Sequence, residues 1–157
     1  MANRKVIGID PGMNGGISVL NADGSVVDVS KMPQTMKDIY EYLKEFADGN
    51  TVCYLEAVGF GIPGQSSKAT ATFARHNGHL EMALLALGIP TNTVTPAKWM
   101  KYFQLGKSSD YSKTEWKNKL KSKAQQLFPQ LGKQITLATS DAILLSEYGR
   151  KQEIGGN

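Results

Sequence analysis

The sequence has little that would mark a secreted or membrane-spanning protein. Its single cysteine, Cys53, lies in the apolar stretch TVCYLEAV, where we expect a buried structural thiol rather than a redox or catalytic one. No segment approaches the roughly 18–20 consecutive apolar residues that a membrane-spanning helix needs. The first residues, MANRK, lead directly into a predicted strand and contain no apolar signal core. We therefore expect a cytoplasmic chain that has no membrane partner and is not secreted.

The composition is ordinary for a globular protein, but the positive charge is unevenly distributed. With 157 residues, of which 41% are hydrophobic and 20% charged, the chain suits one domain spanning residues 1–157. The formal net charge is +4, yet the segment 98–133 holds nine lysines against two acids. A basic field of this size favours a polyanionic partner, although a solvated helix face would show the same pattern.

Apolar periodicity and turn residues predict strands and helices in a recognisable order. We expect strands over residues 5–10, 16–21, 25–32, 51–58 and 89–96, and helices over residues 35–46, 69–87, 113–128 and 140–148. The stretch GFGIPGQSSKAT is rich in glycine and serine and predicts a surface loop over residues 59–70. Strands that first follow one another and then alternate with helices indicate an α/β fold with a mixed sheet.

Three acids occupy positions where a carboxylate is unfavourable unless it has a partner. Asp10 ends the apolar strand KVIGID and precedes a proline and glycines, Glu56 lies within CYLEAV, and Asp141 begins the run AILL. One such acid is usually hydrogen-bonded or half exposed, but three on separate elements suggest convergence at one point. A divalent cation would compensate several carboxylates at once, and hard oxygen ligands favour Mg²⁺ or Mn²⁺.

Four blocks of the sequence resemble, in order, the RuvC family of Holliday-junction resolvases. The blocks are IGIDPGMNGGISVL, YLEAVGF, GIPTNTVTPAKWMKYF and SDAILLSEYGRK. The segments between them are similar to the phage and organellar branch of that family, so the resemblance covers roughly residues 5–150. It implies an RNase H-like α/β fold, a five-stranded mixed sheet flanked by helices. It also implies a Mg²⁺-dependent crossover junction endodeoxyribonuclease, with Mn²⁺ able to substitute.

The resemblance assigns a catalytic role to the three acids. It makes Asp10, Glu56 and Asp141 catalytic metal ligands that hold two ions about 4 Å apart for phosphodiester hydrolysis. The sequence departs from the family pattern one helical turn before Asp141, where a fourth acid is usual and Leu137 and Ala138 stand instead. Water or a hydroxyl then completes the second metal site, or metal binding is weakened. Glu147 lies on a different helix face, and we do not assign it to the site.

Residues around the acids are candidates for contacts with DNA. By resemblance, Phe60 would stack on bases near the junction point, and Lys113 would lie close to the scissile phosphate. An ordinary loop anchor is the alternative for Phe60, and packing is favoured over a DNA contact for Trp99. Further candidates for sugar–phosphate contacts are Gln65, Ser67 and Lys68 in the loop and Lys98, Lys101 and Lys107 in the basic segment.

The resemblance also implies an oligomer and a partner. The predicted helix over residues 69–87 matches the family's dimer-forming helix, so a homodimer would set two active sites against a four-way DNA junction. His76 and His79 lie on this helix without a third metal ligand nearby in sequence, and we expect surface or interface histidines. The expected setting is the cytoplasm of a bacterial or phage-infected cell, with an organelle left open.

Two other functions fit parts of the sequence. A catalytically weak or inactive junction-binding protein of the same fold would explain the missing fourth acid. An actin-like ATPase shares the first-strand aspartate followed by a glycine-rich turn. That class also needs a second acidic, glycine-rich phosphate loop, which the sequence lacks after residue 90, and it gives the lysine-rich helix no role.

Overall fold

The computed structural model describes residues 3–59 and 63–155. This part of the chain is built on one mixed β-sheet. The five strands have the spatial order β3-β2-β1-β4-β5. Their bounds are β1 Lys5–Asp10, β2 Gly16–Asn21, β3 Val26–Lys31, β4 Thr51–Glu56 and β5 Thr91–Val94. The strands β1, β2 and β3 pair in antiparallel fashion, whereas β4 runs parallel to both β1 and β5. This is the five-stranded mixed sheet that the sequence predicted.

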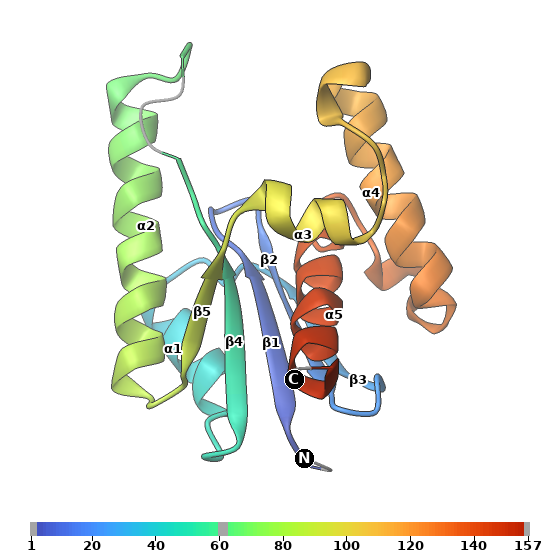
Figure 1. The fold of residues 1–157 in the computed structure, drawn as a ribbon. Helices are drawn as coiled ribbons and strands as arrows, with labels where there is room; N and C mark the ends of the chain where they lie inside the picture. The colour runs from blue at the N-terminus through green and yellow to red at the C-terminus, as the bar shows by residue number, and fades with distance from the viewer. Residues whose placement is uncertain (1–2, 60–62, 156–157) are drawn as a thin grey trace.

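Helices cover both faces of the sheet. Their bounds are α1 Met36–Lys44, α2 Ser67–Ala86, α3 Pro96–Tyr102, α4 Lys113–Leu127 and α5 Ser140–Gly155, with short 3₁₀ helices η1 Ser108–Asp110 and η2 Pro129–Gln134. In Figure 1, α5 lies across one face, and α2 and α4 extend beyond the end of the sheet where β1 and β4 finish. Among the described helices, none is both long and apolar enough to cross a bilayer.

Two hydrophobic cores form because successive side chains of a strand point to opposite faces. Val6 of β1 belongs to a core with Trp99, Trp116 and Ile143, which come from α3, α4 and α5. The next residue, Ile7, belongs to the other core, whose helical members come from α1 and α2. Every described residue from Val6 to Ile9 is buried. The strand that ends at Asp10 therefore lies at the centre of the molecule, enclosed from both faces.

Close contact between β1 and α5 depends on Gly8. A Cβ atom at this position would lie 2.5 Å from the carbonyl oxygen of Ala142 and 2.8 Å from the Cα of Ser146. Real Cβ atoms do not approach backbone atoms so closely, so only glycine allows this packing. The absence of a side chain at Gly8 thus brings the first turn of α5 toward the end of β1.

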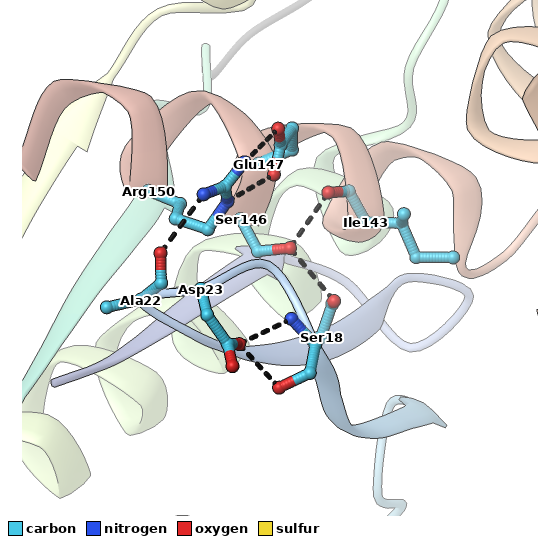
Figure 2. A network of polar contacts seen from close by, with 8 residues as sticks. Ser18, Ala22, Asp23, Ile143, Ser146, Glu147 and Arg150 are labelled. Carbon is cyan, nitrogen blue, oxygen red and sulfur yellow. Dashed lines mark hydrogen bonds and ion pairs between the residues drawn. The ribbon is translucent and has the colours of Figure 1, made fainter. Parts of the chain in front are cut away.

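Polar contacts fix the other side of α5 to the β2–β3 hairpin, as Figure 2 shows. The Nη1 of Arg150 donates to the carbonyl oxygen of Ala22 at 3.0 Å, and its other nitrogens donate to Glu147 at 2.7 and 2.8 Å. Deeper in the same interface, the buried hydroxyls of Ser18 and Ser146 are 2.9 Å apart. These paired groups fix the axial position of α5 on the sheet.

Two predicted helix boundaries were wrong for identifiable reasons. The last helix continues to Gly155 instead of ending at residue 148. Its interior Gly149 packs against the ring of Tyr54, where a Cβ would lie 2.7 Å from the ring carbon Cγ and closer still to Cδ2, so this glycine serves packing rather than termination. Helix α2 begins at Ser67, capped by the Ser66 side chain, so the last four residues of the predicted loop are helical.

The segment around β5 also differs from the prediction. The strand spans only Thr91–Val94, and β4 ends at Glu56 rather than at residue 58. Residue 96 was predicted to end the fifth strand and no element was predicted over residues 97–102, whereas the structure has α3 over Pro96–Tyr102. The Thr95 side chain caps this helix and Pro96 is its first residue, which is a favourable way to begin a helix.

Candidate active site

The three predicted acids lie on elements that meet at one edge of the sheet. Asp10 ends β1 and Glu56 ends β4, and the parallel register pairs Ile9 with Leu55, the residues just before these acids. The carboxyl ends of neighbouring parallel strands therefore place Asp10 and Glu56 side by side. Asp141 lies in the first turn of α5, which packs directly on β1.

Electrostatic coupling among the acids indicates that they share one environment. Burial, and then the negative charges of Asp141 and Glu56, raises the pKa of Asp10 well above its usual range. Burial also raises the pKa of Asp141. For Glu56, burial is the largest cause of a pKa raised to about 7, and the charge of Asp141 adds to it. Nearby carboxylates of this kind are unfavourable together unless protons or cations compensate them.

Glu56 is held in place by Trp99 of α3. The indole Nε1 donates a hydrogen bond of 2.7 Å to Oε2 of Glu56, and this bond acts to lower the pKa of the carboxyl. The indole ring itself is fully buried in the core. The predicted packing role of Trp99 is thus confirmed, and the side chain additionally orients an acid of the site.

A lysine that was not singled out from the sequence contacts Asp141. The Nζ atom of Lys117, on α4, lies 3.5 Å from Oδ2 of Asp141. The two side chains differ in exposure, because that of Lys117 is 39% exposed and that of Asp141 only 7%. The charge of Lys117 opposes the pKa increase at all three acids. The ammonium of Lys117 therefore favours the ionised form of each of the three acids.

The chemistry of these side chains suits a hard divalent cation. Oδ1 of Asp141 is buried and has no hydrogen-bond partner among the described residues, so it is an oxygen available to a ligand. Carboxylate oxygens are the ligands that Mg²⁺ and Mn²⁺ prefer. As the side chains stand, residues 3–59 and 63–155 contain no group of three or more histidines, cysteines, aspartates or glutamates arranged to hold a metal ion. Binding an ion would therefore require the carboxylates to draw together.

The turn after Asp10 is fixed by α2. The backbone N–H of Gly12 donates to Nδ1 of His76 at 3.2 Å, and Gly12 has a φ of +106°, which side chains rarely tolerate. His76 is buried within the chain rather than on its surface, and burial, followed by the charge of His79, lowers its pKa. The prediction of a surface position for His76 was therefore wrong. A neutral His76 positions the loop that follows the first acid.

The position of the expected fourth acid carries no carboxylate in the structure. Leu137 is half exposed, and the neighbouring hydroxyls of Thr139 and Ser140 donate to the backbone oxygens of Gln134 and Thr136. These hydroxyl groups stabilise the start of α5. Glu147, which the sequence left out of the site, is paired with Arg150 on the far side of that helix, as described above.

The predicted DNA-contacting residues at and just before the start of α2 lie next to the loop that follows Asp10. Gln65 and Lys68 line a hollow of about 380 Å³ together with Met13 and His76. Ser67 is exposed on the first turn of the same helix. Phe60 lies outside the described residues. The structure thus brings one predicted loop cluster close to the first acid.

The basic residues form a second cluster on the opposite side of the acids. Lys101 and Lys107 line one hollow of about 560 Å³, together with Trp116. Lys98 is exposed on α3, and Lys113 is exposed at the start of α4. Lys117 follows Lys113 by one helical turn and was missed because it is one of many lysines in the segment. Its four-residue spacing from Lys113 was the one available signal.

Comparison with known proteins gives structural neighbours but no sequence relatives. No protein-family model and no curated protein matches the chain. A structure of Thermus thermophilus RuvC is similar with a TM-score of 0.64 and 15% identity, over 96% of both chains. A structure of T. thermophilus RuvC in complex with a Holliday junction substrate is similar with a TM-score of 0.66 and 13% identity, again over 96% of both chains. The chain therefore has the RNase H-like fold of the RuvC Holliday-junction resolvases, as the sequence resemblance predicted.

Proposed function

We propose that this chain is a divalent-metal-dependent endonuclease that resolves four-way DNA junctions by symmetric nicking as a homodimer. The observation that carries the proposal is the electrostatically coupled group of Asp10, Glu56 and Asp141 at one edge of a RuvC-like sheet. Mutually repelling, partly buried carboxylates are what a phosphodiester-cleaving metal site requires. The basic residues beside them suit a polyanionic substrate.

The site residues have separable roles in this proposal. Mg²⁺ or Mn²⁺ held by Asp10, Glu56 and Asp141 would activate water and offset the charge that develops on the phosphate. Trp99 keeps the Glu56 carboxylate oriented through its hydrogen bond. His76 keeps the loop after Asp10 in place through the N–H of Gly12. These contacts hold the acids ready before any substrate binds, which reduces the reorganisation needed for catalysis.

Contacts with DNA are proposed on both sides of the acids. In Figure 1, α2 rises beyond the sheet on one side and α4 on the other, with α3 between them above the strand ends. Gln65, Ser67 and Lys68 belong to the α2 side. Lys98, Lys101, Lys107 and Lys113 belong to the α3–α4 side. Such flanking polar and basic side chains would hold the phosphate backbones of a branched substrate across the acids without reading base sequence.

A homodimer is proposed through α2. Its side chains Met82 and Leu85 are 61% and 74% exposed, although both are large and apolar. Exposed apolar residues grouped on one helix favour burial against a partner, and a two-fold dimer would use the same patch twice. Sedimentation of Leu85→Lys should show monomers where the wild type shows dimers, and an unchanged wild-type-like mass would exclude this surface as the interface.

The function is tested by strand cleavage of a synthetic four-way junction with Mg²⁺ or Mn²⁺, beside a linear duplex of the same sequence. We expect paired, symmetric nicks on the junction only, abolished in Asp10→Asn and retained in Asp38→Asn. Asp38 is a matched control because it is an exposed acid in the first turn of α1. Tight junction binding without nicks under either metal would refute the nuclease and favour the junction-binding alternative.

A further inference from the structure

The two oxygens of the Asp141 carboxylate have different surroundings, because Lys117 lies near only one of them. Its Nζ lies 3.5 Å from Oδ2 of Asp141, while Oδ1 of the same group is buried and has no hydrogen-bond partner in the described ranges. The ammonium thus satisfies one oxygen and leaves the other open. An ion bound by Asp141 would use the oxygen that faces away from the lysine.

Counting charges limits how many ions such a site would hold. Asp10, Glu56 and Asp141 carry three negative charges when ionised, and Lys117 contributes one positive charge to the same group. The remainder is balanced by one divalent ion. A second would leave an excess of positive charge and would have to bind near an ammonium that already contacts Asp141.

The oxygen donors near Asp141 also favour one bound ion rather than two. A second ion needs its own oxygen donors, and the turn before Asp141 offers Leu137 and Ala138 rather than a carboxylate. The hydroxyl of Thr139 donates to the backbone oxygen of Gln134 and also accepts from the N–H of Thr136, and the hydroxyl of Ser140 is a neutral donor that compensates no charge. Glu147 is paired with Arg150.

We propose that the centre binds a single divalent cation per chain and that the ammonium of Lys117 supplies the second positive charge. The inference rests on the proposed nuclease function and replaces the two ions implied by the family resemblance. Lys117 is exposed enough to reach a phosphate lying over the site, yet α4 keeps its base fixed because Trp116 and Leu120 are buried. A fixed ammonium beside one metal ion can offset charge on a phosphate without a second metal site.

The test is a Mn²⁺ titration of the DNA-free chain, with free Mn²⁺ followed by electron paramagnetic resonance. The variants are Lys117→Met, Lys117→Glu and Asp10→Asn. The matched control is Lys123→Met, since Lys123 lies on the same helix and bonds Gln126 at 3.3 Å instead of an acid of the site. Thermal melting of each variant checks that it is folded. The Mn²⁺ dependence of junction cleavage is measured alongside.

We expect one Mn²⁺ per wild-type chain, lost in Asp10→Asn and unchanged in Lys123→Met. Lys117→Met should bind its ion at least about tenfold more tightly, because a repulsive charge is removed. Lys117→Glu should bind a second ion, because it replaces a cation with a ligand. Cleavage by the wild type should depend on Mn²⁺ with a Hill coefficient near one.

Two results would overturn the inference while leaving the nuclease intact. One is a wild-type chain that cleaves junctions and binds two Asp10-dependent Mn²⁺ ions. The other is a folded Lys117→Met chain with the same Mn²⁺ affinity as the wild type. Absence of both Asp10-dependent Mn²⁺ binding and junction cleavage would instead remove the proposed function, and the inference with it.

Discussion

In buffer without divalent cations, Glu56 should make the protein less stable as the pH rises from about 4.5 to about 7. Its pKa is raised from 4.5 to about 7, chiefly by burial, so the native state binds this proton more tightly than the unfolded state does. The stabilising contribution is complete below pH 4.5 and is lost as the pH rises through about 7. A rise of this size corresponds to about 3 kcal/mol of unfolding free energy. Asp10, whose pKa is also raised, adds a decrease of the same sign.

A comparison with Glu56→Gln measures this contribution together with the part of the Asp10 pKa increase that the charge of Glu56 causes. The pKa of His76 is lowered in the native state, so this residue makes the protein more stable as the pH rises toward about 6.5. The pH dependence of the wild-type unfolding free energy is therefore a sum of opposing contributions. Unfolding free energies of both proteins are measured by urea denaturation between pH 4 and 8, with fluorescence of the buried Trp99 and Trp116 as the signal. The difference between wild type and variant should fall by about 3 kcal/mol over this range. A difference constant to within about 0.5 kcal/mol would refute the reasoning, and saturating Mn²⁺ should flatten the wild-type slope.

Three substitutions test other contacts. Gly8→Ala should lower the free energy of unfolding in urea by about 1–3 kcal/mol and reduce junction cleavage, because the added Cβ pushes α5 off β1. Gly78→Ala on α2, where a Cβ would meet open space, should be neutral or stabilising, and equal stabilities of the two variants would contradict the close packing at Gly8. Trp99→Phe should raise the pKa of Glu56 further because it removes the 2.7 Å hydrogen bond, and a titration of that carboxyl by NMR should show the shift. Arg150→Met should cost about 3–5 kcal/mol in thermal or urea unfolding because it leaves a buried carboxylate without its partner, and a loss below about 1 kcal/mol would show that the pair is solvated.

The central sheet could be predicted from the sequence because its boundaries have strong local signals. The strands over residues 5–10 and 16–21 match the structure residue for residue, since a proline ends the first strand and glycines precede the second. The end of α5 could not be predicted, because Gly149 looks like a helix terminator until the ring of Tyr54 is known to pack on it. Helix α3 is too short to show periodicity, although Thr95 and Pro96 announce its start.

The acids of the site could be proposed from sequence because carboxylates among apolar residues stand out. The structure brings Asp10, Glu56 and Asp141 into one electrostatic environment, while their catalytic role stays a prediction. The partners of these acids could not be found in the same way. Lys117 has the same local pattern as its neighbouring lysines, and only the packing of α4 beside α5 distinguishes it. The role of His76 likewise could not be predicted, because it accepts a hydrogen bond from the backbone N–H of Gly12, which lies 64 residues earlier in the sequence.

Because Lys117 lies on α4, the charge of the site and the stability of the central sheet depend on different elements of the fold. The acid at the centre of the sheet belongs to the most constrained strand, so changing its surroundings would endanger the whole fold. The lysine belongs to a peripheral helix attached through a few buried residues, among them Trp116 and Leu120. Substitution along that helix can therefore retune the charge of the site while the sheet stays as it is. Under the proposed function, a protein built in this way would change its metal requirement by surface mutation, without redesign of its core.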